Sequence, residues 1–366
     1  MKGSYIMSKK NIYVDFHVLQ TVPPSCVNRD DTGSPKTAVY GGTVRARVSS
    51  QSWKHAMREM FRDEIFGVEP IGIRTRTSNV IKMVADELAE MGIDDGEKKA
   101  VKKFSDIGVK AKESKNDKDS DSLIFVTREQ IKAMSKLIAE NNNEKDTFKL
   151  ALKEEPSVDM LLFGRMIATT DKSKSVSLNY DAAAQVAHSI STHTVHNEYD
   201  YFTAVDDCDS IGAGHLGTVE YNSATLYRYA TVNVTELAGS LGKNVTPNAV
   251  RGFAEAFIRS MPTGKQNTFA NRTLPDAIYV TLRRDQPVNL CGAFEKPVYT
   301  GAGGYAEPSE KALVDYAEKV YKDYVNEPQA AFAVGEGMEK LAKTMSLKEL
   351  LDRVKDEVSE CLEGEM

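Results

Sequence analysis

The order of the predicted strands and helices most limits how this chain can fold. One strand-like segment, Asn11–Gln20, precedes the helix-rich stretch 62–170, and another, Ala277–Arg283, follows it. In the first segment, apolar residues such as Val14 and Phe16 alternate with polar ones, which predicts a strand with one buried face. Strands and helices mixed in this order favour an α+β fold that contains the helical stretch as an insertion.

Turn residues and caps mark the end of the first strand and the start of the first helix. The segment Val22–Lys36 is rich in Pro, Asp, Asn and Gly, so it predicts an irregular loop. Gly41-Gly42 opens a second strand. Ser49-Ser50 supply natural N-caps for a helix that starts near Gln51.

Helical periodicity is common in the rest of the chain. The predicted helices are Ser78–Met91, Gly96–Phe104, Thr127–Glu140, Asp181–His193, one from Thr246 to about Met261, Ser309–Tyr324 and Ser346–Leu362. Thr127 and Gln130 form a capping-box pattern. Thr218–Val234 has strong strand character, and the charge-dense segment Lys110–Ser122 predicts a solvated stretch.

Composition excludes several classes of protein. Hydrophobic residues make up 41% of the chain and charged residues 27%, which is compatible with a packed core. No apolar run approaches the ~20 residues that span a bilayer, and the N-terminal residues do not resemble a secretory signal. The four cysteines are too widely spaced for a disulfide framework, so we expect a cytoplasmic protein.

One predicted helix, Gln51–Arg62, has two chemically different faces. One face is polar and largely cationic, and it carries Gln51, Lys54, His55, Arg58 and Arg62. The opposite face carries Trp53, Ala56, Met57, Met60 and Phe61. This pattern predicts that the second face packs against the core while the first remains accessible.

The positive charge is concentrated near this helix. Residues 1–62 hold ten Lys and Arg against four Asp and Glu, although the whole chain has a net charge of −6. Arg45 and Arg47 alternate along the preceding strand and are expected on one face, and Arg29 and Lys36 lie in the loop before it. The cluster favours a track for nucleic-acid phosphates, with a merely solvated helix surface as the alternative.

Two adjacent segments admit more than one interpretation. Gly212–Gly217 matches G-x-G-x-x-G, but acids precede it and a strand-like run follows, so a hairpin is favoured over a dinucleotide site. Tyr201-Phe202 lies among acidic loop residues. These aromatics are either exposed wedges that stack on nucleobases or anchors for the base of the hairpin.

Several residues invite a metal interpretation that the spacing does not support. His188, His193 and His196 cannot all share one helical face, and no cysteine lies near them. Asp30-Asp31 and Asp206-Asp207 could serve a metal-assisted nuclease, but no second ligand set is evident. We therefore expect no metal site and no cofactor.

Longer blocks of sequence carry a resemblance to a known family. PSCVNRDDTGSPKTAVYGG, followed by VRARVSSQSWKHAMR, resembles the opening of the backbone subunits (CasC) of the type I-E CRISPR Cascade complex, in the RAMP superfamily. Later blocks agree in the same order. They are GRMIA, AHSISTHTV, YFTAVDD, HLGTVEYNSATLYRYA and GKQNTFA.

The resemblance implies a hand-like architecture with an RNA-recognition-motif (ferredoxin-like) palm, helical fingers and a β-hairpin thumb. The implied parts are palm 1–61, fingers 62–170, a palm helix 171–193, thumb 194–224 and a palm completion with acidic helices, 225–366.

The resemblance also implies which residues contact RNA. The implied contacts to the guide-RNA backbone are Arg29, Lys36, Arg47, Ser49, Gln51, Lys54 and Arg58. Arg165 and Met166 are implied to lie near the bases, Tyr201 and Phe202 to help displace a base, and Gly264, Lys265 and Gln266 to form a further contact loop.

The function implied by the resemblance is a non-catalytic scaffold for CRISPR RNA in antiviral defence. Copies of the chain would assemble along one guide RNA with other Cascade subunits and would present the spacer to target DNA, without a membrane. In RNA-guided effectors, base pairing reads the target sequence while the protein binds phosphates and the shape of the duplex. The alternative is a metal-dependent RNA endonuclease of the same superfamily.

Overall fold

The computed structural model describes residues 11–66, 74–77, 79–110, 124–171, 175–205 and 213–364. The chain divides into two compact units, each described by itself below. The sheet unit comprises Met1–Phe61 and Ala184–Met366, and the helical unit comprises Arg62–Ala183. Helices together with antiparallel strands confirm the predicted α+β class.

The sheet unit is built on one large antiparallel sheet. Its strands follow the order β11 (Ala330–Val334), β10 (Ala277–Arg283), β1 (Tyr13–Ser25), β9 (Ala213–Asn233), β7 (Ser189–Ser191), β3 (Thr43–Val48) and β2 (Thr37–Tyr40), and β6 (Ala184–Val186) also pairs with β9. The strand predicted at Ala277–Arg283 is confirmed. The first strand continues to Ser25, so the start of the expected loop is extended backbone.

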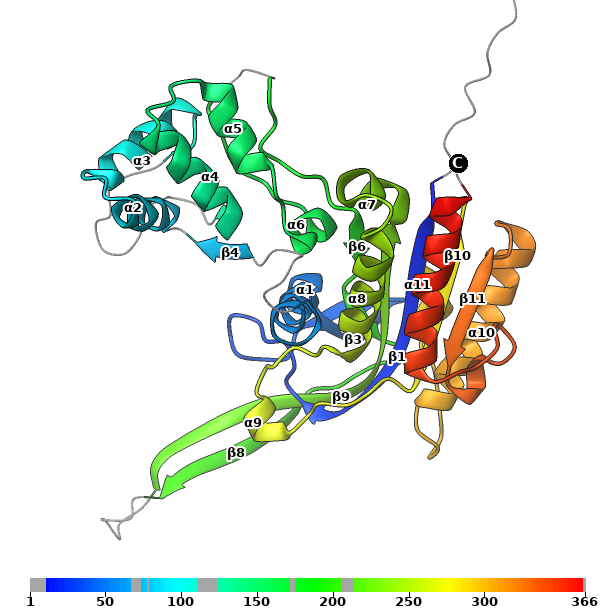
Figure 1. Ribbon diagram of the computed structural model, residues 1–366. Coiled ribbons are helices and arrows are strands. Elements are labelled where there is room, and N and C mark those ends of the chain that lie inside the picture. The colour runs from blue at the N-terminus through cyan, green and yellow to red at the C-terminus, as the bar shows by residue number, and fades with distance from the viewer. Residues whose placement is uncertain are drawn as a thin grey trace, which may run out of the picture. The chain divides into compact units, whose positions relative to one another are not determined.

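Helices cover both faces of this sheet. Phe16 of β1 packs against Phe253 and Phe257 of α8 (Thr246–Arg259), with ring centroids 5.5 and 6.1 Å apart. On the same side lie α1 (Ser50–Met60) and α11 (Leu347–Glu363), and Figure 1 shows α8 and α11 over the strands. The opposite face is covered by α10 (Ala306–Asp323) and the 3₁₀ turn η2 (Leu290–Phe294).

Because α10 and η2 cover the second face of the sheet, β1 is buried on both faces, which corrects the expectation that it has one buried face. Asp15 and His17 are almost fully buried, and their neighbours supply hydrogen bonds. The Asp15 carboxylate accepts bonds from the Tyr229 hydroxyl (3.1 Å) and the Val288 amide (2.8 Å). Burial raises the pKa of Asp15 to about 6 and lowers the pKa of His17 to about 3. The polar residues of β1 therefore lie on a second buried face of the strand and not on a face exposed to solvent.

The predicted helix Asp181–His193 is wrong, and with it the palm helix 171–193. The structure has two short strands there, β6 and β7, both paired with β9. Ala184 and Val186 are buried while Gln185 between them is exposed, which is the alternation of a strand. Pairing with β9 outweighs the helical propensity of the alanines, because it gives hydrogen-bond partners to backbone N–H and C=O groups of both paired strands.

The long strand β9 belongs both to the sheet and to a hairpin. β8 (Glu198–Val205) pairs with the first part of β9, from Glu198 opposite Tyr221 to Val205 opposite Ala213. The rest of β9 pairs with β1. Figure 1 shows the β8–β9 hairpin extending beyond the sheet. Gly217 lies in its returning arm, as predicted, while residues 206–212 lie outside the described residues.

Shorter elements complete the sheet unit. They are α7 (Val234–Leu241), α9 (Gln266–Phe269) and the 3₁₀ turn η3 (Glu336–Met338). The π-helical turn η1 (Phe61–Ile65) continues α1 across the boundary between the two units. The predicted helices near Thr246, Ser309 and Ser346 are confirmed as α8, α10 and α11. In the part of the chain that the structure describes, no helix combines the length and apolarity needed to cross a bilayer.

The helical unit has its own core. Its elements are β4 (Arg74–Thr77), α2 (Val80–Glu90), α3 (Gly96–Asp106), β5 (Ile124–Thr127), α4 (Arg128–Ala139), α5 (Lys145–Lys153) and α6 (Val158–Phe163). Three predicted helices are confirmed as α2, α3 and α4, and Thr127 and Gln130 make both bonds of the predicted capping box. The segment Lys110–Ser122 lies almost wholly outside the described residues.

The helical unit ends later than the fingers boundary expected at residue 170. Antiparallel backbone bonds join Arg165 to Tyr180, and the Ala183 amide donates to the Leu161 carbonyl (3.0 Å). These bonds tie the chain up to Ala183 to the helical unit.

Candidate nucleic-acid interface

Helix α1 is held firmly by its apolar face. Trp53, Ala56, Met57 and Met60 are buried, as the periodicity predicted. The Trp53 indole N–H donates to the Ser189 hydroxyl (2.9 Å), and the Arg228 guanidinium lies 3.8 Å from the centre of the Trp53 ring. Polar residues of α1 therefore project from a fixed support.

Three of the predicted cations, Lys36, Arg47 and Lys54, gather beside α1 around His188, and a fourth, Arg58, lies next to Lys54 one turn further along the helix. The Arg47 Nη1 lies 3.4 Å from His188 Nδ1, and the Arg47 Nε donates to the Thr37 carbonyl (3.1 Å). Burial, followed by the positive charges of Arg47, Lys36 and Lys54, lowers the pKa of His188. Burial and the neighbouring Arg58 charge likewise lower the pKa of Lys54. Lys36, Arg47, Lys54 and Arg58, here called the cation cluster, thus share one small region.

Hydrogen bonds tie the loop before β2 to the start of α1. The Asn28 carbonyl accepts from the Lys36 amide (2.8 Å), and its side-chain oxygen accepts from the Ser49 amide (2.9 Å). Inside the loop, Asp30 accepts hydrogen bonds from the Thr32 hydroxyl and from the Thr32 and Ser34 amides, and these bonds, the hydroxyl's first, lower the pKa of Asp30. The loop is therefore folded onto the β3–α1 junction rather than loosely attached.

Ser49 and Gln51 stand at the first turn of α1. Ser49 is buried and caps the helix, since its hydroxyl accepts from the Ser52 amide (3.3 Å). Gln51 is exposed on the same side as the cation cluster. Ser49 thus stabilises the start of α1 from inside the protein, whereas the exposed Gln51 can reach a ligand.

A second cationic group lies where the Gly264 loop meets the Arg29 loop. A Cβ on Gly264 would overlap the Val27 carbonyl, so the two backbones approach as closely as glycine allows. Lys265 takes a left-handed conformation (φ 46°) before α9, and Gln266 is exposed. Burial raises the pKa of Cys26, and the nearby charges of Lys265 and Arg29 oppose that rise.

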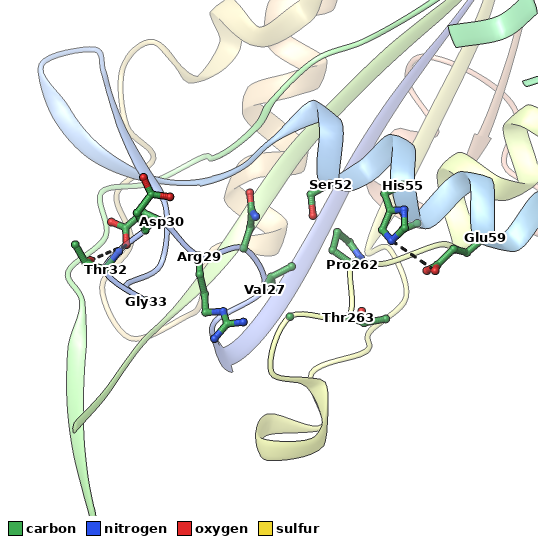
Figure 2. Close-up of a pocket in the computed structure, with 14 residues that line it drawn as sticks. Val27, Arg29, Asp30, Thr32, Gly33, Ser52, His55, Glu59, Pro262 and Thr263 are labelled. Carbon is green, nitrogen blue, oxygen red and sulfur yellow. Dashed lines mark hydrogen bonds and ion pairs between the residues drawn. The ribbon is translucent and has the colours of Figure 1, made fainter. Parts of the chain in front are cut away.

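A pocket of about 530 Å³ lies between these segments. Figure 2 shows Arg29 and Asp30 on one wall, His55 and Glu59 of α1 on another, and Thr263 on the third segment. His55 Nε2 lies 3.5 Å from a Glu59 carboxylate oxygen. His55 and Glu59 lie on the side of α1 next to the one that carries Lys54 and Arg58, so the pocket and the cation cluster occupy neighbouring sides of the helix.

The hairpin presents its two predicted aromatics on opposite faces. Tyr201 and Phe202 are 72% and 45% exposed, and both lie in β8. Successive residues of a strand point to opposite sides, so the pair cannot act together on one base. The Phe202 ring covers Gly217, where a Cβ would overlap it. Tyr201 is therefore the more accessible of the two.

The structure corrects the prediction that Arg165 lies near RNA bases. Arg165 is 2% exposed, and its guanidinium donates to the carbonyls of Leu152 (2.9 Å) and Leu178 (2.9 Å) within the helical unit. Burial lowers its pKa to about 10. Its donors are engaged inside the protein, so the side chain cannot reach a ligand, whereas Met166 is 82% exposed.

Arg45 is a second correction, because it does not share a surface with Arg47. Its side chain is buried, and it donates to the carbonyls of Ser191 (2.9 Å) and Phe294 (3.0 Å). It joins β3 to β7 and to η2 instead of facing a ligand.

His193, one of the residues considered for metal binding, has other contacts. His193 stacks on Tyr305 with centroids 3.6 Å apart, and its Nε2 accepts from the Thr225 amide. Within the described ranges, no group of three or more His, Cys, Asp and Glu side chains is placed to hold a metal ion. Asp206 and Asp207 lie outside those ranges.

Comparison with known proteins identifies the family. The sequence pattern of the CT1975-like protein family matches residues 14–357. The chain belongs to this family. It superimposes on a chain of a solved "CRISPR RNA-guided surveillance complex, pre-nicking" with TM-score 0.81 and 32% identity, covering 94% of this chain and 100% of that chain. A second structure, a "CRISPR RNA-guided surveillance complex", superimposes with TM-score 0.72 and 28% identity, covering 94% of this chain and 99% of that chain. A comparison with curated proteins finds no match.

Membership of the CT1975-like family confirms the resemblance to subunits of CRISPR surveillance complexes. The assignment to type I-E and the individual RNA contacts stay predictions.

Two residues of the candidate interface are not predicted from the sequence as part of it. His188 was considered only as a metal ligand, and Asn28 was not considered at all. Their roles depend on contacts with residues 21 to 141 positions away, which no local pattern encodes.

Proposed function

We propose that this member of the CT1975-like family is a CRISPR RNA-binding scaffold subunit of a Cascade-type surveillance complex. Several copies would line one guide RNA, together with other subunits, and present the spacer for pairing with target DNA. The observation that carries the proposal is the cation cluster, Lys36, Arg47, Lys54 and Arg58, on one side of α1. Clustered Lys and Arg bind backbone phosphates without reading sequence, which suits a protein that must accept any spacer.

The surroundings of the cluster support an extended nucleic-acid path. Arg29 lines the pocket beside α1, and Lys265 follows Gly264, which also lines it, so both cations would prolong the contact along a strand. The exposed Tyr201 offers a stacking surface on the hairpin. The solved structures of similar fold are described as RNA-guided complexes, which agrees with RNA as the ligand.

The finer architecture belongs to the same proposal. The antiparallel sheet with its helices would be an RNA-recognition-motif palm of the RAMP type, the helical unit the fingers, and the β8–β9 hairpin the thumb. The complex would be of type I-E and cytoplasmic.

We also propose that the chain does not cleave RNA. Asp30, one of the acids considered for catalysis, accepts hydrogen bonds within its own loop. The alternative, a metal-dependent endonuclease, would need Asp31 or the histidines.

The test is a double substitution, Lys54→Ala with Arg58→Ala. It should weaken binding to RNAs of unrelated sequence equally, by about tenfold or more, and lower the slope of log K against log salt by about 0.7 for each lost phosphate contact. Fluorescence anisotropy at several salt concentrations measures both effects.

The matched control is Lys319→Ala with Lys322→Ala, which removes the same charge from exposed positions of α10 on the other face of the sheet. A loss confined to particular RNA sequences, or an equal loss in the control, would contradict the proposal. Cleavage of CRISPR RNA with Mg²⁺ that disappears in Asp31→Ala would replace it with the endonuclease alternative.

A further inference from the structure

We propose that His188 is a positioning residue of the cation cluster, whose neutral ring holds the Arg47 guanidinium and the first amide of α1 in place for a phosphate. The inference rests on the proposed function and adds to it a residue that would act through another side chain.

The contacts of His188 determine where its proton resides. His188 follows β6 and precedes β7, and its Nδ1 lies 3.3 Å from the Ser50 amide nitrogen and 3.4 Å from Arg47 Nη1. Both partners are N–H groups that can only donate, so Nδ1 must accept from both. A neutral ring then carries its proton on Nε2.

The surrounding charges keep the ring in this state. Lys36, Arg47 and Lys54 all act on His188, and an imidazolium would add a positive charge among them. Protonation would also turn Nδ1 into a donor that faces two other donors. The lowered pKa of His188 agrees with this geometry.

The same contacts restrict Arg47. Its guanidinium is held at Nε by the Thr37 carbonyl and at Nη1 by His188, which engages two of its five N–H donors. Three donors remain for an anion, and their direction is set in advance. Without His188 the guanidinium would keep one anchor and would have to be ordered when RNA binds, at a cost in affinity.

A double-mutant cycle tests this coupling. His188→Ala should weaken RNA binding about threefold to tenfold, and it should have a much smaller effect in an Arg47→Ala background, where only the contact to the Ser50 amide remains to be lost. Additive losses would overturn the inference, because His188 would then act independently of Arg47.

Two conservative variants sharpen the test. His188→Asn places an acceptor near the position of Nδ1 and should restore most of the affinity, whereas His188→Gln places its amide near Nε2 and should not. His196→Ala, at an exposed histidine, is the control and should bind like the wild type. Restoration by Gln but not by Asn would contradict an acceptor role for Nδ1.

The tautomer provides a readout without RNA. Long-range ¹H–¹⁵N NMR spectra of the ¹⁵N-histidine-labelled chain should show the His188 proton on Nε2 at neutral pH, and an Nδ1–H tautomer would overturn the inference. If Lys54→Ala/Arg58→Ala weakens binding but His188→Ala does not, only this inference fails. If neither change weakens binding, the proposed function fails as well.

Discussion

Two regions of the molecule contain arginines that were predicted to contact RNA, and they use them in opposite ways. Beside α1, Arg47 is anchored by a single carbonyl and by His188 and stays partly exposed. In the helical unit, Arg165 donates to the carbonyls of Leu152, Leu178 and Phe125 and is buried. Both arginines occur in sequence blocks that resemble the same family, but only one can reach a ligand.

The difference shows what decides the role of an arginine. A guanidinium has five donors, so a region that directs several backbone carbonyls at it can saturate it and make it structural. Arg45 illustrates the same point within the sheet unit, two residues from Arg47. A cation is available to RNA only where the fold leaves its donors without enough internal acceptors.

The largest expected effect is a loss of stability when the buried arginine of this comparison, Arg165, is replaced. Arg165→Ala should reduce the free energy of unfolding by about 3–5 kcal/mol, because it leaves buried carbonyls without donors and opens a cavity. Urea denaturation followed by circular dichroism measures the loss, and hydrogen exchange should locate it in the helical unit.

Met166→Ala is the control for this prediction, because its side chain is 82% exposed and should change stability by less than about 0.5 kcal/mol. An Arg165→Ala chain that is fully stable yet binds RNA poorly would return Arg165 to the interface.

A smaller effect is expected at Gly264, whose close backbone contact with Val27 brings the loops of Arg29 and Lys265 together. Gly264→Ala should cost about 1–3 kcal/mol of stability, because its Cβ would overlap the Val27 carbonyl. Separation of the two loops should also weaken RNA binding severalfold through Arg29 and Lys265. Thermal denaturation and anisotropy measure the two effects.

Gly239→Ala in α7 is the matched control, since nothing outside the neighbouring backbone of its own helix lies within 4 Å of its Cβ position. There alanine should stabilise the helix by about 0.5–1 kcal/mol. Equal behaviour of the two variants would show that the close approach at Gly264 is unimportant.

The smallest effect on stability is expected on the hairpin. Tyr201→Ala should change the free energy of unfolding by less than about 0.5 kcal/mol, because the side chain is exposed. In the proposed assembly the hairpin would act on RNA held by a neighbouring copy, so the RNA affinity of the isolated chain should stay almost unchanged. Target-DNA capture by the assembled complex should nevertheless decrease. Phe202→Ala, on the opposite face of β8, should have a different effect on capture, and identical losses would contradict the separation of the two faces.

Sequence alone predicted the features that depend on neighbours along the chain. The apolar face of α1, the capping box at Thr127 and the strand Ala277–Arg283 all follow from local periodicity and local hydrogen bonding. The blocks that resemble the family identified it, and the matched residues confirm the membership.

Only the tertiary structure decided the features that depend on residues far away in the chain. β1 has two buried faces because α8 and α10, more than two hundred residues later, cover both, and 181–193 forms strands because β9 pairs with it. The grouping of Lys36, Arg47 and Lys54 around His188 has the same origin. Periodicity records which side of an element is apolar, but burial and the availability of a charge depend on what the rest of the chain packs against that element.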